Sequence, residues 1–179
     1  MREIELPPAR PALEWAGGRI SQKVSPQRRH ALAQARFAAA LGAWAQERGS
    51  GMVGTEWEFN LAAHGEIRRP LVPDVAYLLY RQVPSNRVDD ADFPCVAPNA
   101  VIEVLAPCDR ALEIEEKVRV YLASGTSVVF LVDPEAQTVT IRDGSMPVMF
   151  DRDHDVSHHS LHGFTMPACQ LFDAPRPLR

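Results

Sequence analysis

The architecture of this chain follows from two segments, RRPLVPDVAYLLY (residues 68–80) and NAVIEVLAPCDRALEIEEKVRVYLASG (residues 99–125). Each begins with an apolar run rich in β-forming residues, and each run carries one acid, Asp74 in the first and Glu103 in the second. Carboxylates are rarely buried in such runs unless they are paired with a cation or hold a metal ion. The two acids are therefore the first candidates for a functional site.

Hydrophobic periodicity predicts a mixture of helices and strands along the chain. A helix is expected to begin at Ser25 and Pro26 and to end near Arg48, before Gly49. The other expected elements are strands over 52–61, 71–79 and 99–106, a helix over 110–124, a strand over 127–133, and a hairpin over 137–150. The run SVVFLVD at 127–133 is almost wholly apolar, which is typical of a central strand covered on both faces. This order predicts an α/β (α+β) fold in which a central mixed β-sheet is flanked by helices.

The length of 179 residues fits one domain with a hydrophobic core that needs no disulfides. Residues 1–18 are rich in proline and glycine and are expected to form an N-terminal arm or a short edge strand. Residues 19–175 are expected to form the single domain, because the sequence has no internal repeat and no linker-like segment.

The composition limits the classes of function. The net charge of -4 argues against a generic basic protein that coats nucleic acid, although residues 19–48 are locally basic. The 3 cysteines have no CxxC spacing, which favours a reduced compartment. The sequence also has no secretory signal and no apolar run of about 18 residues. These features predict a cytoplasmic protein that does not enter a membrane.

Asp74 and Glu103 on neighbouring strands could hold a divalent cation such as Mg²⁺ in an oxygen-rich site. Lys117 lies 14 residues after Glu103, on the expected helix that follows its strand, and could fold back to the acids. Each residue also has a structural interpretation. Asp74 could begin a strand or a turn, Glu103 could belong to an edge strand or an ion pair, and Lys117 could pair with Glu113 on the helix surface.

The first expected helix has a face that is apolar at one end and polar at the other. Phe37, Leu41 and Trp44 form the apolar end, and stepping back by three and four residues reaches Gln34 and His30. Such a helix could bury one end and line a cleft with the other. A packed or hydrogen-bonded histidine is the alternative for His30. In the strand expected over 52–61, Glu56 and Glu58 are expected on the solvent side.

The combination PLVPDVAYL (70–78) and APNAVIEVLAPCDRALEIEEKVRVYLASGTSVVFLVDPEAQTVTI (97–141) resembles the Uma-two family of putative restriction endonucleases, a branch of the PD-(D/E)xK nuclease superfamily. The closing LHGFTMPACQLFD (161–173) is similar to the C-terminal segment of that family. The match covers residues 14–173. The resemblance implies a restriction-endonuclease-like core that uses a divalent metal ion.

In this resemblance Asp74 and Glu103 match the motif acids that bind the metal. The wider superfamily has its lysine two residues after the glutamate, where this chain has the apolar Leu105. The family places the lysine on the following helix, and Lys117 matches that place. His30 matches a histidine of the first helix, where the wider superfamily often has a glutamate. The resemblance implies that it lines the site or contacts a phosphate.

The function that the resemblance implies is hydrolysis of DNA phosphodiester bonds with Mg²⁺ or Mn²⁺. Asp74 and Glu103 would bind the ion, Lys117 would assist the attacking water, and His30 with nearby arginines would hold phosphate. The alternative is a nuclease-fold module that has lost catalysis and binds nucleic acid or a protein partner. Apolar strands near the C-terminus are candidates for a homodimer contact. Enzymes that cut both strands of a duplex commonly act as dimers with two-fold symmetry.

A second candidate metal site lies near the C-terminus, where four histidines fall within nine residues. Zn²⁺ or Ni²⁺ would suit imidazole ligands. Without a cysteine partner, a polar loop and an edge strand is the favoured interpretation. These residues are His154, His158, His159 and His162.

Overall fold

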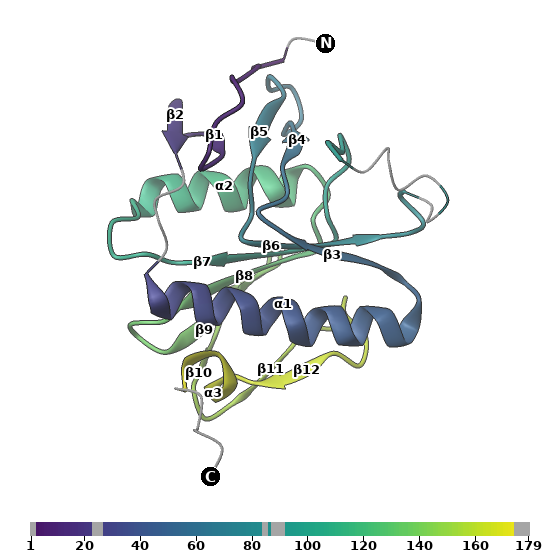
Figure 1. The fold of residues 1–179 in the computed structure, drawn as a ribbon, viewed down its shortest axis with the longest axis vertical. Helices are drawn as coiled ribbons and strands as arrows, with labels where there is room; N and C mark the ends of the chain where they lie inside the picture. Colours follow the sequence, from purple (N-terminus) through teal and green to yellow (C-terminus); the bar gives the residue numbers. More distant parts are fainter. Residues whose placement is uncertain (1–2, 23–26, 84–85, 87–91, 174–179) are drawn as a thin grey trace.

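The structure is a computed structural model that describes residues 3–22, 27–83, 86 and 92–173. Within these residues the centre of the molecule is a 6-stranded mixed sheet of order β10-β9-β8-β7-β6-β3 (Figure 1). β7 and β8 run parallel, and the other neighbours in this sheet are antiparallel. The strands are β3 (Gly51–Thr55), β6 (Val75–Leu79), β7 (Ala100–Val104), β8 (Val128–Asp133), β9 (Thr138–Arg142) and β10 (Val148–Asp151).

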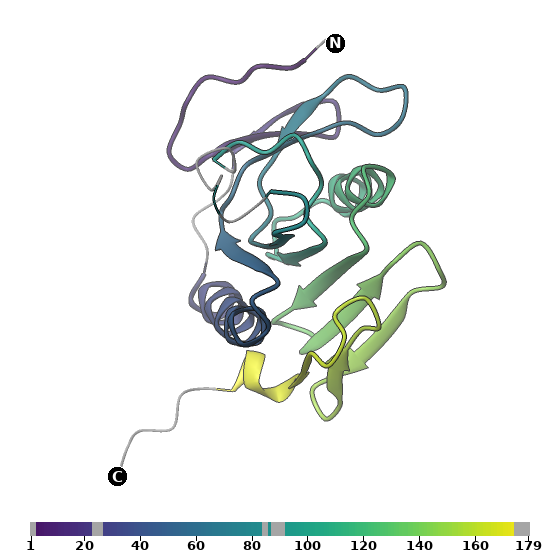
Figure 2. The ribbon, with the colours of Figure 1, turned by 90° about the vertical axis from the view of Figure 1, so that its right-hand side faces the viewer.

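Two helices cover the opposite faces of this sheet, as Figure 2 shows in a view close to the helix axes. Helix α1 (Arg28–Arg48) buries one stripe of residues spaced by four, which includes Phe37 and Leu41. Helix α2 (Ala111–Ala123) connects β7 to β8 and packs on the other face. The predicted mixed sheet flanked by helices is therefore confirmed. No helix in the described part of the chain is long and apolar enough to cross a bilayer.

The ends of α1 follow its sequence only in part. The helix ends at Gly49 as predicted, because Gly49 adopts a left-handed conformation with φ 57° and its N–H is bonded to the carbonyls of the last turn. The expected start at Ser25 and Pro26 lies outside the described residues. The first described turn begins after Gln27, whose side chain makes no capping hydrogen bond.

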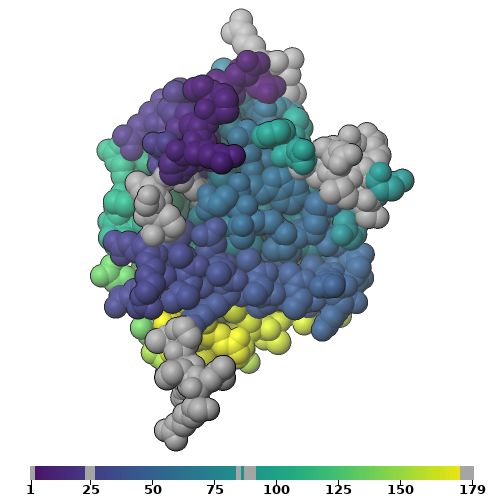
Figure 3. Space-filling model, viewed as in Figure 1, coloured from purple at the N-terminus to yellow at the C-terminus, as the bar shows by residue number. Residues whose placement is uncertain are grey.

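Smaller elements lie on both sides of the main sheet. Figure 1 shows two hairpins on the side of α2, and a third hairpin with a short helix beside α1. The N-terminal segment, purple in Figure 3, covers the part of the molecule above α1 in that view. The elements are β1 (Leu13–Ala16) with β2 (Arg19–Gln22), β4 (Phe59–Leu61) with β5 (Arg69–Leu71), β11 (Asp155–Ser157) with β12 (Thr165–Pro167), and α3 (Cys169–Phe172).

Two expected strands are each broken in the structure. The strand expected over 52–61 divides into β3 and β4, because Glu56 has a positive φ of 51° and turns the chain out of the sheet. The strand expected over 71–79 divides into β5 and β6 around Pro73, which has no N–H for a sheet hydrogen bond. Asp74 therefore lies directly before β6 and not inside a strand.

Candidate active site

The pairing of β6 with β7 brings the two acids of the motif together. Val75 is paired with Ile102 in an antiparallel register, so Asp74 precedes Val75 where Glu103 follows Ile102. Opposed residues of antiparallel strands point to the same face of the sheet. The Asp74 carboxylate accepts a hydrogen bond from the N–H of Val104 at 2.6 Å, which ties it to the end of β7. Both acids are buried, with 3% of each residue exposed.

Lys117 reaches this pair of acids from α2. Its Nζ lies 2.7 Å from Oε2 of Glu103, and only 4% of the residue is exposed. The interpretation as a surface pair with Glu113 is therefore wrong, because the side chain points into the molecule. Tyr121, one turn later on the same face of α2, donates its hydroxyl to Oε1 of Glu103 at 2.8 Å. Glu103 is thus held by two side chains of α2.

A third buried carboxylate, Glu14 of β1, joins the group, although the sequence did not single it out. Lys117 Nζ lies 3.2 Å from its Oε1 and 3.1 Å from its Oε2. The backbone N–H of Val72 also donates to Oε2 of Glu14, at 3.3 Å. Glu14 is the single acid of the short run LEWA, a pattern like that of Asp74 and Glu103. This signal could have identified it.

The β1–β2 hairpin that carries Glu14 is fastened to α2 by its turn. The N–H of Gly17 donates to the carboxylate of Glu116, and the Arg19 guanidinium lies 2.6 Å from Oε1 of Glu113. The boundary predicted between residues 18 and 19 falls in this turn. Residues 1–18 therefore include a strand that supplies a side chain to the site.

The polar end of α1, which was expected to line a cleft, lies beside Asp74. Nε2 of His30 is 3.5 Å from Oδ2 of Asp74, within ion-pair distance when the imidazole is protonated. The Gln34 amide donates to the backbone carbonyl of Asp74 and to Oε1 of Glu56, both at 3.0 Å. Glu58, which was expected on the solvent side, is half-buried, and this burial raises its pKa.

These side chains line a cavity of about 560 Å³. A neighbouring cavity of about 440 Å³ shares His30 and Ala106 with it and is bordered by Arg28 and Arg29 at the start of α1. Both arginine side chains are exposed. The acids therefore lie deep in a cavity that continues towards two exposed cations. The side chains of the group in the first cavity are Glu14, His30, Asp74, Glu103 and Lys117.

The charges in this group do not cancel. Burial lowers the pKa of Lys117, but the carboxylates, Glu103 first among them, raise it more, so the pKa lies above its usual value. Burial and then the Glu103 charge raise the pKa of Tyr121 well above its usual value. Lys117 is therefore charged and Tyr121 neutral at physiological pH. Three carboxylates and one ammonium leave a formal charge of about -2 if His30 is neutral.

The donor set fits a hard divalent cation. The carboxylates of Asp74 and Glu103 and the carboxylate of Glu14 offer oxygen ligands, which Mg²⁺ and Mn²⁺ prefer. A divalent ion would also balance the excess negative charge in a buried place, where unpaired charges are costly. Asp74 and Glu103 oppose each other at the ends of β6 and β7 and would be the pair to hold such an ion, with Glu14 next to them through Lys117.

The histidines near the C-terminus do not form one cluster. His154 contacts Asp151, with its Nδ1 2.6 Å from Oδ1 of that residue. His158 and His159 lie together near a different acid, Asp143. These side chains belong to the segments around β9 and β11. The cluster of Glu14, Asp74 and Glu103 instead lies between the sheet and α2.

Comparison with known proteins places the chain beside nucleases. A family model described as a putative restriction endonuclease, Uma2, matches residues 3–168. The chain is similar to the crystal structure of a putative nuclease belonging to DUF820 from Anabaena variabilis, with 24% sequence identity and a TM-score of 0.81. This similarity covers 93% of each chain and shows a shared fold. None of the curated proteins matches the sequence.

Proposed function

The chain belongs to the Uma2 family of putative restriction endonucleases, as its motifs predicted, and we propose that it is a metal-dependent endonuclease that hydrolyses DNA phosphodiester bonds. One observation supports this proposal most strongly. The lysine that the wider superfamily has two residues after the glutamate is absent here, yet Lys117 Nζ lies 2.7 Å from Glu103. An acid pair and an ammonium group therefore meet in one buried cavity.

Asp74 and Glu103 would hold Mg²⁺ or Mn²⁺ in this function. When bound, such an ion lowers the pKa of a water molecule and stabilises negative charge on a phosphoryl oxygen. The chain's own part is to keep the two carboxylates in place. The Val104 N–H orients Asp74, and the Tyr121 hydroxyl orients Glu103. Fixed ligands of this kind reduce the reorganisation that the reaction requires.

Lys117 would act as a cation and hydrogen-bond donor. Its raised pKa keeps the amine protonated, so it does not serve as the general base. A buried ammonium group can orient the attacking water and stabilise the charge that develops on the phosphate. Its contact with Glu14 gives the ammonium group a second carboxylate partner, from β1.

Exposed cations next to the cavity would receive the DNA backbone. Arg28 and Arg29 border the neighbouring cavity, and His30 connects it to the acids. Arginine contacts to phosphate position a nucleic acid without reading its sequence. They would also offset the repulsion between a phosphate and the three carboxylates.

The test is cleavage of supercoiled and single-stranded DNA in Mg²⁺ or Mn²⁺, with a chelator as the metal-free control. The wild type is compared with Asp74→Ala, Glu103→Ala and Lys117→Ala. We expect metal-dependent nicking in the wild type and its loss in all three variants. RNA of the same sequence, run in parallel, shows whether the substrate class is wider than DNA.

The second candidate is a nuclease-fold module that binds nucleic acid or a protein without cutting. The acidic net charge and the missing Glu-x-Lys spacing favour it. It predicts that wild type and variants are equally inert on every substrate, while the wild type still binds DNA or a partner. Metal-dependent thermal stabilisation that disappears in Asp74→Ala would instead favour the nuclease.

The homodimer stays a prediction. β10 is an edge strand of the main sheet, and large apolar side chains are exposed on it and just before it. An exposed edge strand is a place where a second chain can pair. The side chains are Met146, Val148 and Met149.

Replacing Glu14 by glutamine tests whether the N-terminal hairpin belongs to the active site. We expect cleavage to fall by about 10–100-fold, because Glu14 holds Lys117 in place much as outer-shell groups hold metal ligands. DNA binding should change little, since Glu14 is buried. Cleavage rates and DNA affinity are measured in the same buffer. An unchanged rate would mean that the hairpin only covers the site.

A further inference from the structure

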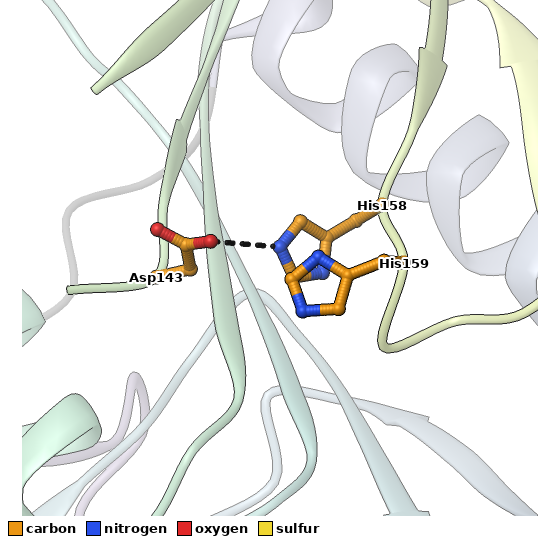
Figure 4. A group of neighbouring side chains, drawn as sticks. All are labelled: Asp143, His158 and His159. Atoms are coloured by element: carbon orange, nitrogen blue, oxygen red, sulfur yellow. Dashed lines mark hydrogen bonds and ion pairs between the residues drawn. The ribbon is translucent and has the colours of Figure 1, made fainter. Parts of the chain in front are cut away.

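A second group of potential metal ligands lies away from the carboxylate site. Asp143 directly follows β9, and His158 and His159 directly follow β11. One ligand atom from each of the three side chains lies within 4.8 Å of the others. Figure 4 shows the two imidazole rings side by side and facing the Asp143 carboxylate. Two segments separated in the sequence therefore meet here.

His158 has the least exposed side chain of the group, with 7% of it exposed. Its Nε2 lies 3.1 Å from Oδ2 of Asp143, and its Nδ1 lies 2.7 Å from the hydroxyl of Ser160. The backbone N–H of Ser160 also donates to Nδ1, at 3.3 Å, so Nδ1 is an acceptor and Nε2 carries the proton that it donates to Asp143. An ion bound at Nε2 would take the place of this proton, since metal binding to histidine releases protons.

The Asp143 carboxylate is oriented by its own turn. Ser145 donates its backbone N–H at 2.9 Å and its hydroxyl at 2.5 Å, both to Oδ1. Oδ2 is therefore the oxygen that faces His158. A separation of about 3.1 Å between Oδ2 and Nε2 also suits two ligands of one ion at about 2.0–2.1 Å from each.

His159 distinguishes this group from an ordinary histidine–aspartate pair. Its ring centroid lies 4.1 Å from that of His158 with an interplanar angle of 43°, and its side chain is exposed. The hydrogen bonds of His158 to Asp143 and Ser160 need no second imidazole. The imidazole of the exposed His159 supplies the third ligand atom within 4.8 Å of the other two.

We propose that Asp143, His158 and His159 form a binding site for a divalent transition-metal ion, with Zn²⁺ as the representative ion. Two imidazoles and one carboxylate suit Zn²⁺ and its neighbours in the first transition row, whereas Mg²⁺ prefers oxygen ligands. Water would complete the coordination on the exposed side of His159. The site thus differs in ligand chemistry from the group around Glu103.

The consequence of occupancy is structural. The ion connects the β9–β10 turn, through Asp143, to the segment between β11 and β12, through both histidines. That segment packs against α1 through Phe164, whose ring lies 6.0 Å from that of Phe37 and 5.8 Å from that of Trp44. Binding a ligand to the folded state alone raises stability. Zn²⁺ is therefore expected to stabilise the contact of the C-terminal segment with the sheet.

The test measures Zn²⁺ affinity by competition with a chromophoric chelator, and Tm with and without Zn²⁺, on the full chain. All samples contain excess Mg²⁺ to occupy oxygen-rich sites. At Zn²⁺ about 100-fold above its Kd, the Tm of the wild type should rise by about 5–10 °C. His159→Ala should bind Zn²⁺ at least about tenfold more weakly, with the metal-free Tm unchanged because the ring is exposed.

Matched variants separate this site from the other histidines and from the carboxylate group. His154→Ala, His162→Ala and Asp74→Asn should keep the wild-type Zn²⁺ affinity, whereas Asp143→Asn should lose it. The proposal is overturned if the wild type shows no Zn²⁺-dependent rise in Tm. It is equally overturned if His159→Ala binds Zn²⁺ as tightly as the wild type, which would leave His158 and Asp143 as a structural hydrogen bond only.

Discussion

Glu103→Gln is expected to reduce DNA cleavage on the order of 10³-fold or more without destabilising the metal-free protein. The loss of activity follows from the loss of a charged metal ligand, since the ion contributes several kcal/mol of charge stabilisation in such reactions and each 1.4 kcal/mol is about tenfold in rate. Glutamine has nearly the same shape. Its amide oxygen can accept from Lys117, and its NH2 group can then donate to the hydroxyl oxygen of Tyr121.

The metal-free stability of Glu103→Gln should not fall with its activity. Asp74 and Glu14 lie close enough to Lys117 for their charges to affect its pKa together with Glu103. Removing one of three buried negative charges reduces their mutual repulsion while Lys117 keeps its contact with Glu14. We therefore expect the metal-free free energy of unfolding to be equal to or higher than that of the wild type. The rise in Tm on adding Mg²⁺ should disappear.

Glu115→Gln is the matched control, because Glu115 lies on α2 but pairs with Arg142 on the exposed side. It should leave both cleavage and the Mg²⁺ response unchanged. Denaturant unfolding with and without Mg²⁺ and cleavage rates are measured on all three proteins. If Glu103→Gln cleaves DNA as fast as the wild type, Glu103 is not a ligand of the catalytic metal ion. Lower metal-free stability would show that its charge is needed for folding.

The sequence was sufficient to predict α1, α2 and the central strands, and it also singled out His30 and three charged residues that meet in the candidate site. Asp74, Glu103 and Lys117 could be predicted because each departs from its local pattern. The acids interrupt apolar runs, and the lysine lies on the helix that must pack back on the same strand. The structure brings these three together through the β6–β7 register and the connection from β7 to α2.

The single acid in LEWA could have marked Glu14 as a candidate, but its place beside Lys117 could not be predicted, because it depends on contacts between distant segments. Gly17 and Arg19 fasten its hairpin to α2, about 100 residues later in the chain. Local periodicity contains no information about such contacts. The breaks at Glu56 and Pro73 were missed for a related reason. Alternating apolar residues continue through both breaks, and only tertiary packing directs the chain into a separate hairpin there.

In the proposed nuclease, the lysine would act from a different place in the sequence than in the wider superfamily. Leu105, at the position of the superfamily lysine, donates its backbone N–H to Val132 and borders the neighbouring cavities. Lys117 supplies an ammonium group to the same carboxylate from the helix that covers this face of the sheet. Under this proposal the charge next to Glu103 would keep its place in space, although its place in the sequence differs.

Lys117→Met is the variant for which we expect the largest loss of stability. Methionine preserves the apolar length of the side chain but leaves Glu103 and Glu14 buried without their cation. Removing one partner of a buried ion pair typically costs about 3–5 kcal/mol, and we expect a decrease of this size in the free energy of unfolding. Because the raised pKa keeps Lys117 charged, its full contribution to the free energy of unfolding is present below about pH 10. The difference in free energy of unfolding between Lys117→Met and the wild type should therefore stay constant from about pH 7 to about pH 9.

Arg119→Met is the control for this variant, since it removes a cation from the same helix where the side chain is half exposed and paired with Glu66. Its effect should be within about 1 kcal/mol. Cleavage should be lost in Lys117→Met and kept in Arg119→Met.

Mg²⁺ should raise the Tm of Lys117→Met more than that of the wild type, because the cavity then has one more uncompensated negative charge to attract the ion. Equal stabilities of the two variants would show that the carboxylates do not depend on Lys117. An Mg²⁺ response no larger than that of the wild type would show that the ion binds outside this group.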